Sequence, residues 1–110
     1  MNYRNKELKM NISNNVSSIQ AHQTMMNNNA HNVANVNTDG FVPTDTRIFE
    51  AGNAVVANGR KADDNGSIKS QTDLSKEITN QIVVEDATAV NVSAIKRQDE
   101  MFGSLLDIKA

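Results

Sequence analysis

The chain contains no cysteine and no tryptophan, and it has one proline, one tyrosine and three phenylalanines. Because cysteine is missing, disulfide frameworks, thiolate catalysis and cysteine-based zinc sites are excluded. No apolar run approaches the ~18 residues that a membrane-spanning helix needs. The polar residues at the start are not followed by the apolar core of a signal peptide. We therefore expect no direct membrane insertion, and we expect any export to proceed without a cleaved signal peptide.

Net charge and apolar bulk are also low. The formal net charge is -2 and the sequence pI is about 5.6, so there is no electrostatic case for binding nucleic acid. Hydrophobic residues make up 38% of the 110 residues, and the mean hydropathy is -0.51. A small domain buries a limited share of its surface even with a rich core. We expect one structural unit whose stability depends on partners.

The first half of the chain carries a helical pattern. Polar residues fill positions 1–7, which we expect to form a mobile N-terminus. After them, one stripe repeats at steps of four and three residues: Ile12, Val16, Ile19, Gln23, Met26, Ala30 and Val33. This spacing predicts a helix over residues 8–36 with a single apolar face, interrupted by the polar Gln23. A helix with one apolar stripe is expected to lie against another helix.

A second helical pattern occupies the C-terminal segment, residues 74–110. Thr72 or Asp73 is suited to cap its start. Apolar residues run along one broad side over 74–108, and a second stripe adjoins it near the end at Ile95, Phe102 and Leu106. These last turns are apolar over more surface than one partner helix can cover. Packing between several subunits would bury the excess.

Residues 37–73 have the composition of a turn and linker. Pro43 blocks continuation of a helix. The dipeptide Asn58-Gly59 is typical of a two-residue hairpin turn, here between residues 55–57 and 60–62. The predicted fold class is all-α: a long antiparallel two-helix coiled-coil hairpin, joined by a mostly irregular linker that leaves room for a small β-hairpin.

The most distinctive stretch runs from Ala30 to Phe41. Gly40 suits the chain reversal just past a helix end, and the preceding Asn, Thr and Asp side chains favour caps and turns. The sequence from Ala30 onward reads AHNVANVNTDGF. It resembles the N-terminal signature of the bacterial flagellar rod and hook family, whose members read close to ANNIANVNTPGY. His31 and Phe41 stand where the family often has Asn and Tyr.

The C-terminal segment resembles the same family. Family members read close to E…I…AYxAN…I…DEMLGxLLDI. The matching residues are Glu77, Ile78, Ala87, Asn91, Ile95, Asp99, Glu100, Met101, Gly103, Leu105, Leu106, Asp107 and Ile108. Thr88 replaces the usual Tyr, and Phe102 replaces a frequent Leu. The resemblance leaves residues 42–72 uncovered, and the short middle is similar to that of the proximal-rod proteins.

The resemblance implies a function as well as a fold. It implies a structural subunit of the flagellar basal-body rod, assembling helically through its terminal helices to transmit torque for motility. The implied partners are other flagellar axial proteins, copies of the chain and the flagellar type III export apparatus, and the implied location is the periplasmic rod. The residues expected to carry assembly are Ala30, Asn32, Val33, Ala34, Asn35, Asn37, Thr38, Gly40, Phe41, Asn91, Ile95, Met101, Phe102, Leu105, Leu106 and Ile108.

No constellation of residues indicates catalysis. His22 and His31 are nine positions apart, which places them on opposite faces of a helix. The acidic run at residues 63–66 does not fit a calcium-binding loop. Lys61 stands at the first ligand position of such a loop, and Thr72 replaces the Glu that closes it. We expect no enzyme activity, no cofactor and no bound metal. The alternative that stays open is a flagellum-associated accessory or regulatory helical module that binds without entering the rod.

Overall fold

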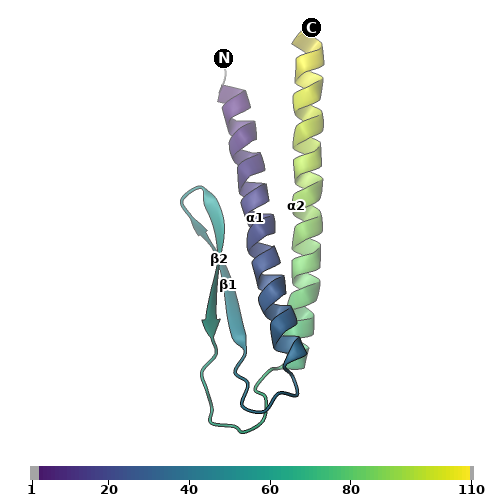
Figure 1. Ribbon diagram of the computed structural model, residues 1–110. Helices are drawn as coiled ribbons and strands as arrows, with labels where there is room; N and C mark the ends of the chain where they lie inside the picture. Colours follow the sequence, from purple (N-terminus) through teal and green to yellow (C-terminus); the bar gives the residue numbers. More distant parts are fainter. Residues whose placement is uncertain (1–2, 110) are drawn as a thin grey trace.

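A computed structural model describes residues 3–109 of the chain, with side chains described for residues 12–104. The elements in order are α1 (Tyr3–Ala34), β1 (Thr44–Ala51), β2 (Ala54–Lys61) and α2 (Leu74–Lys109). The two helices lie side by side and antiparallel, so that both ends of the chain are at the same end of the molecule (Figure 1). The result is a rod-shaped subunit, 67 × 23 × 13 Å in Cα extent. The helices expected over 8–36 and 74–108 correspond to α1 and α2.

The all-α prediction was wrong. The segment between the helices forms a two-stranded antiparallel sheet, with a continuous register from Thr44 opposite Lys61 to Ala51 opposite Ala54. This hairpin packs along α1 on the side away from α2, giving three layers in the order hairpin, α1, α2 (Figure 1). Contact with α1 is the physical reason that eight-residue strands form here, because an isolated two-stranded hairpin is marginal in water.

The position of the hairpin turn also differs from the prediction. The chain turns at Gly52 and Asn53, where Gly52 has φ 65 and fits the first central position of a type II′ turn. Gly59, expected in the turn, lies inside β2 against α1. A Cβ atom at Gly59 would lie 3.1 Å from Asn28 Nδ2 and 3.3 Å from Thr44 Cγ2. The glycine therefore serves close packing of strand on helix and not chain reversal.

The seam between α1 and α2 is thin and partly polar. Among the described side chains, Ala21 and Val84 are the buried hydrophobic residues. Asn15 Nδ2 donates to Gln98 Oε1 at 3.2 Å, so polar groups also cross the seam. Apolar residues of the expected α1 stripe are mostly half-buried, as Ile19 and Met26 are, whereas Val16 is 41% exposed. Neither helix, over its described residues, is long and apolar enough to cross a membrane.

Candidate functional site

Three buried polar side chains meet where α1 ends and α2 begins. Asn32 is 1% exposed, Asn29 3% and Glu77 4%. Asn32 Nδ2 donates to Thr44 O at 2.8 Å and to Glu77 Oε1 at 3.0 Å, and its Oδ1 accepts from Thr44 N at 2.9 Å. The Asn32 amide thus pairs with β1 as a neighbouring strand would, while it also holds α2. We name Asn29, Asn32, Thr44 and Glu77 the polar junction.

Glu77 is the charged member of the polar junction. Asn29 Nδ2 donates to the Glu77 carbonyl oxygen at 2.9 Å and also to its carboxylate oxygen Oε2. Burial raises the pKa of Glu77, while the hydrogen bond from Asn32 and the positive charge of Lys76 act in the opposite direction. Asn29 Oδ1 is buried with no partner among the described residues. A buried carboxyl with two amide donors ties both helices to the start of the hairpin.

The turn after α1 is held by its own side chains. Asn35 Nδ2 donates to His31 O at 2.9 Å, and Thr38 Oγ1 donates to Asn35 Oδ1 at 3.0 Å. Gly40 has φ 73, and its N–H donates to Ile68 O at 2.9 Å. The left-handed backbone at Gly40 is disfavoured for a residue with a Cβ atom. The signature stretch therefore fixes how the chain leaves α1.

Residues just before α2 return to the end of α1. Thr72 Oγ1 donates to Asn32 O at 3.1 Å, and Ser70 Oγ donates to Asn35 O at 2.8 Å. These bonds add a second donor to two carbonyl groups at the helix end, which also accept from Asn35 N and Thr38 N. Of the two candidate caps of α2, Asp73 fills the role, because its Oδ1 accepts from Lys76 N at 3.3 Å.

The structure brings only part of the expected assembly residues together. Asn32, Asn35, Thr38, Gly40 and Phe41 belong to the polar junction and its turn. There the Phe41 and His31 rings meet edge to face with centroids 5.5 Å apart. Val33 is half-buried beside them, whereas Ala30, Ala34 and Asn37 are exposed.

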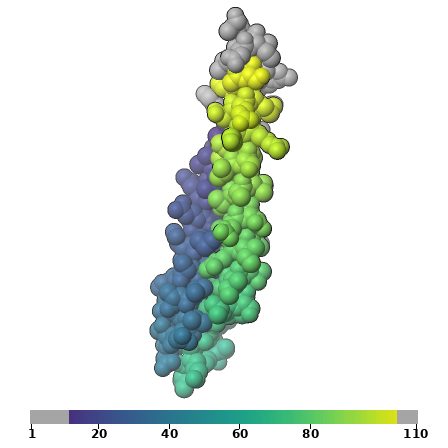
Figure 2. Space-filling model, turned by 90° about the vertical axis from the view of Figure 1, so that its right-hand side faces the viewer, coloured from purple at the N-terminus to yellow at the C-terminus, as the bar shows by residue number. Residues whose placement is uncertain are grey.

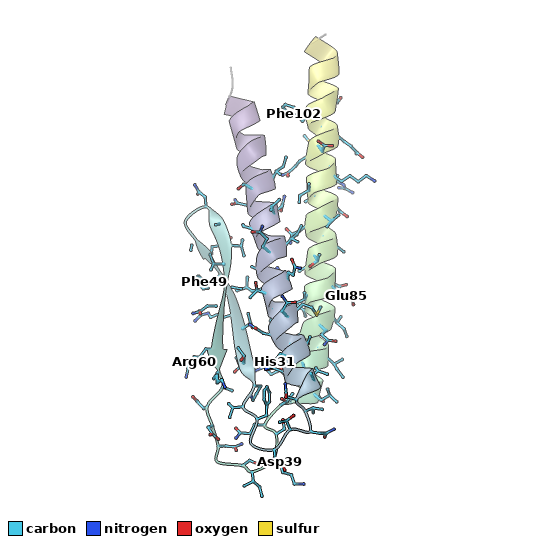
Figure 3. The ribbon with its side chains drawn as sticks, viewed as in Figure 1. His31, Asp39, Phe49, Arg60, Glu85 and Phe102 are labelled. Atoms are coloured by element: carbon cyan, nitrogen blue, oxygen red, sulfur yellow. The ribbon has the colours of Figure 1, made fainter. Side chains whose placement is uncertain are left out.

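The expected residues of α2 lie elsewhere. Asn91 Nδ2 donates to Ser18 Oγ at 3.0 Å in the middle of the helix pair, and Ile95 is half-buried there. Phe102, labelled in Figure 3, is half-buried near the far end, and its neighbour Met101 is exposed. The side chains of Leu105, Leu106 and Ile108 lie outside the described residues.

Sequence reasoning missed Asn29, Thr44 and the buried state of Glu77. Asn29 and Asn32 are three positions apart on one helix face, a spacing that signals a shared polar contact. Glu77 is the acidic residue in the first turn of α2. That position suggests a favourable interaction with the helix dipole, and nothing local distinguishes it from a solvated carboxylate.

A second feature of the molecule is the outer side of α2. Seven of its large apolar side chains are at least 43% exposed, and Val90 reaches 68%. We name this set the uncovered α2 face: Leu74, Ile78, Ile82, Val83, Val90, Val92 and Met101. In the view of Figure 2, α2 runs along the surface with no other element over it. Seven exposed large apolar residues on one helix of a small molecule are typical of an interaction surface.

The groove between the two helices offers little for chemistry. An apolar groove of about 420 Å³ runs between the helices beside Ile19, Met26 and Val84. It lacks the convergent titratable groups that mark an active site. Across the part of the chain that the structure describes, no three His, Cys, Asp or Glu residues are close enough to hold a metal ion. The site is therefore best described as a structural junction next to an uncovered apolar helix.

Comparison with known proteins adds no relative. No family model matches the sequence, and no curated protein is significantly similar to it.

Proposed function

We propose that this protein is a structural subunit of the bacterial flagellar basal-body rod. In this proposal, α1 and α2 line up with the helices of neighbouring subunits and build a tube that transmits torque. The support from sequence is the resemblance of residues 30–41 and of the C-terminal segment to the flagellar rod and hook family. Its partners would be copies of itself and other axial proteins, after passage through the flagellar type III export apparatus.

The single structural observation that carries the proposal is the uncovered α2 face. Side chains such as Ile82, Val83 and Val90 are more than half exposed in the isolated subunit. Burying apolar surface is worth about 25 cal/mol per Å², so this face favours association with further helices. The elongated shape suits lateral stacking, because α2 presents its length to a neighbour. Head-to-tail contacts of this kind build helical assemblies when the rotation does not close.

The polar junction supports the same proposal in a different way. A rod subunit must hold its two helices in one relative position while neighbouring subunits load them. The bonds from Asn32 and Asn29 to Glu77 fix that position at one end of the helix pair. The buried, specific geometry fits a role in setting the angle between helices more than a role in binding a small molecule.

The first experiment is to purify hook–basal bodies and to quantify this chain in them by mass spectrometry. A rod subunit is expected at several copies per structure, in a fixed ratio to the other rod proteins. Recovery of the chain only in the cytoplasm would contradict the proposal. That result would favour the accessory module, a helical binding protein that does not enter the rod.

A matched pair of variants tests the uncovered α2 face directly. Val90→Asp places a charge in this face, whereas Lys96→Gln makes the same change of net charge at an exposed position that is already polar. Val90→Asp is expected to abolish incorporation into the rod while the free subunit stays folded by circular dichroism. Lys96→Gln should be incorporated as the parent chain is. Equal incorporation of both variants would contradict the assembly role of this face.

A further inference from the structure

We propose that neighbouring copies of this chain join edge to edge through their hairpins, so that β2 of one copy pairs with β1 of the next. The result is a continuous antiparallel sheet running across the subunits, outside the layer of helices. The inference rests on the proposed function, because it requires copies stacked side by side in one orientation. It names a second contact between copies, separate from the uncovered α2 face.

The hydrogen bonds at the hairpin edges show which backbone groups face outward. In an antiparallel pair, alternate residues direct N–H and C=O toward the partner strand and away from it. The N–H of Thr44 donates to Asn32 Oδ1, and the N–H of Val55 donates to Ser17 Oγ, so both N–H groups bond to side chains of α1 and not to the other strand. Both residues therefore face away from the ladder. By alternation, the outward set continues along the two strands at Thr46, Ile48 and Glu50 of β1 and at Ala57, Gly59 and Lys61 of β2.

These outward groups match those of a displaced copy. Moving a hairpin sideways by two strand spacings, about 10 Å, places β1 of the new copy antiparallel to β2 of the first. At that displacement Ala57 lies opposite Ile48 of the next copy, and Gly59 lies opposite its Thr46. All four residues direct their backbone groups into the new gap, so that hydrogen bonds form without a change of register. Packed helices lie about 8–10 Å apart, so the same step also brings α1 beside α1 of the next copy.

The side chains on the outer face are complementary under the same displacement. Within one hairpin, Asp45 lies opposite Arg60 and Phe49 lies opposite Val56, while the ion pairs of Asp45 and Arg60 are with Lys76 and Asp63. In a copy displaced by two strand spacings, the same residues recur at the same height along the strands. Arg60 therefore lies beside Asp45 of the next copy, and Val56 lies beside its Phe49. Phe49 is 40% exposed and Val56 38%, so both have apolar surface left to bury. Phe49 and Arg60 lie on the side of the hairpin away from α1 (Figure 3).

The strands lack three of the features that usually protect an edge, although they carry charged side chains and α1 side chains already bond the edge N–H groups of Thr44 and Val55. Natural edge strands are commonly shortened, bulged or interrupted by proline. Here the register is unbroken over eight residues on each strand, with no proline in either. An edge of this kind is a template for another strand, and the approach of Arg60 to Asp45 of the next copy favours the opposite edge of the same chain over a like edge. A second copy is therefore the occupant that fits.

Because the chain has no cysteine, single introduced cysteines can test the pairing. Arg47 and Asn58 are exposed and face each other on the outer surface of one hairpin. Between copies they would form a non-hydrogen-bonded pair with Cα atoms about 4.5 Å apart, within disulfide reach. Full-length Arg47→Cys and Asn58→Cys chains are purified separately, mixed at high concentration, oxidised mildly and resolved on a non-reducing gel. Neither chain can form a disulfide within itself.

The expected result is a mixed dimer formed at least about fivefold more than in a control that pairs Arg47→Cys with Ala54→Cys, since residue 54 is displaced about 13 Å along the strand. Equal yields from the two mixtures would overturn the inference. So would preferential homodimers of either single variant, which indicate like edges, or no disulfide at all, which indicates that another partner or solvent covers the edge.

The two proposals fail separately. A chain present in purified rods but giving no specific disulfide would refute the shared sheet and leave the rod subunit standing. A specific disulfide from a chain absent from rods would keep the edge contact and refute the rod.

Discussion

Asn32 and Glu77 lie 45 positions apart in the chain, and Asn32 Nδ2 donates to Glu77 Oε1 at 3.0 Å inside the molecule. The bond joins the last turn of α1 to the first turn of α2. Through its two bonds to Thr44, the same amide also holds the start of β1. One asparagine side chain therefore sets the relative position of three elements.

Asn32→Ala is predicted to destabilise the subunit strongly. The substitution removes three hydrogen bonds and leaves the Thr44 backbone groups and a Glu77 oxygen buried without partners. Each buried unsatisfied group costs about 1–3 kcal/mol, so we expect a loss of about 3 kcal/mol or more in the free energy of unfolding. Urea denaturation followed by circular dichroism measures it. Asn37→Ala, at an exposed position, is the control and should change stability by less than about 0.5 kcal/mol.

Glu77 gives stability a pH dependence with a defined sign. Its pKa is higher in the folded chain than its ordinary value of 4.5, because burial disfavours the charged carboxylate. The folded state then holds its proton more tightly than the unfolded state does. The contribution of Glu77 to stability therefore falls as pH rises from about 4.5 through the folded-state pKa, and it is constant above that.

The measurement is the midpoint of thermal unfolding across this pH window for the parent chain and for Glu77→Gln. Asp64, whose pKa is lowered by bonds from Gln71 and Gly66, contributes the opposite slope in both proteins, mainly below its ordinary pKa of 3.8. The difference between the two curves isolates Glu77. It should shift in favour of the Gln variant as pH rises through the window. A difference that stays flat would show that the carboxyl titrates alike in the folded and unfolded chains.

Two glycines are predicted to respond in opposite directions. Gly59→Val should destabilise the hairpin, because even a Cβ at this position would lie 3.1 Å from Asn28 Nδ2. Gly103 lies in α2 with nothing within 4 Å of the added Cβ. Gly103→Ala should therefore stabilise the subunit by up to about 1 kcal/mol, the usual difference in helix propensity. Thermal unfolding of both variants provides the comparison, and a gain in stability from Gly59→Val would rule out the close packing of β2 on α1.

The ion pair between Lys76 Nζ and Asp45 Oδ1, 2.8 Å long, is predicted to matter little for stability. Both side chains are about half exposed, and the hydrogen bond with Asp45 raises the pKa of Lys76. Exposed pairs are worth about 0.2–1 kcal/mol and weaken with added salt. Lys76→Met should cost less than about 1 kcal/mol at low salt and nothing measurable at high salt. A large cost that persists in salt would mean that Lys76 has a packing role beyond the ion pair.

The two helices can be predicted from the spacing of apolar residues in the sequence, whereas the two strands cannot. Apolar residues at steps of three and four predict two helices, and the structure contains both. In residues 44–61 the apolar side chains are sparse, because one face of the hairpin is solvated and the other is completed by small residues such as Ala57 and Gly59. Small residues that allow close approach to α1 read locally as turn or linker residues.

One part of the candidate site can likewise be predicted from the sequence, and another part cannot. The turn from Asn35 to Gly40 is local, so its capping side chains and its glycine can be recognised from sequence. The bond from Asn29 to the carbonyl oxygen of Glu77 joins residues 48 positions apart. Whether a carboxylate in a first helical turn is solvated or buried depends on what packs over it, and no local pattern specifies that.

The layer order has a consequence for how the subunit opens. The hairpin packs along α1 and meets α2 through the Lys76–Asp45 ion pair, so α1 has a packed layer on two sides while the hairpin and α2 each have a packed layer on one side. Either outer layer can detach while the other stays in place, but α1 loses its structure only after both have left. The amide protons of α1 between Ile12 and Ala34 should therefore exchange with solvent more slowly than those of α2 or the strands. With α1 as the most protected element, the hairpin or α2 can rearrange while the central helix stays folded.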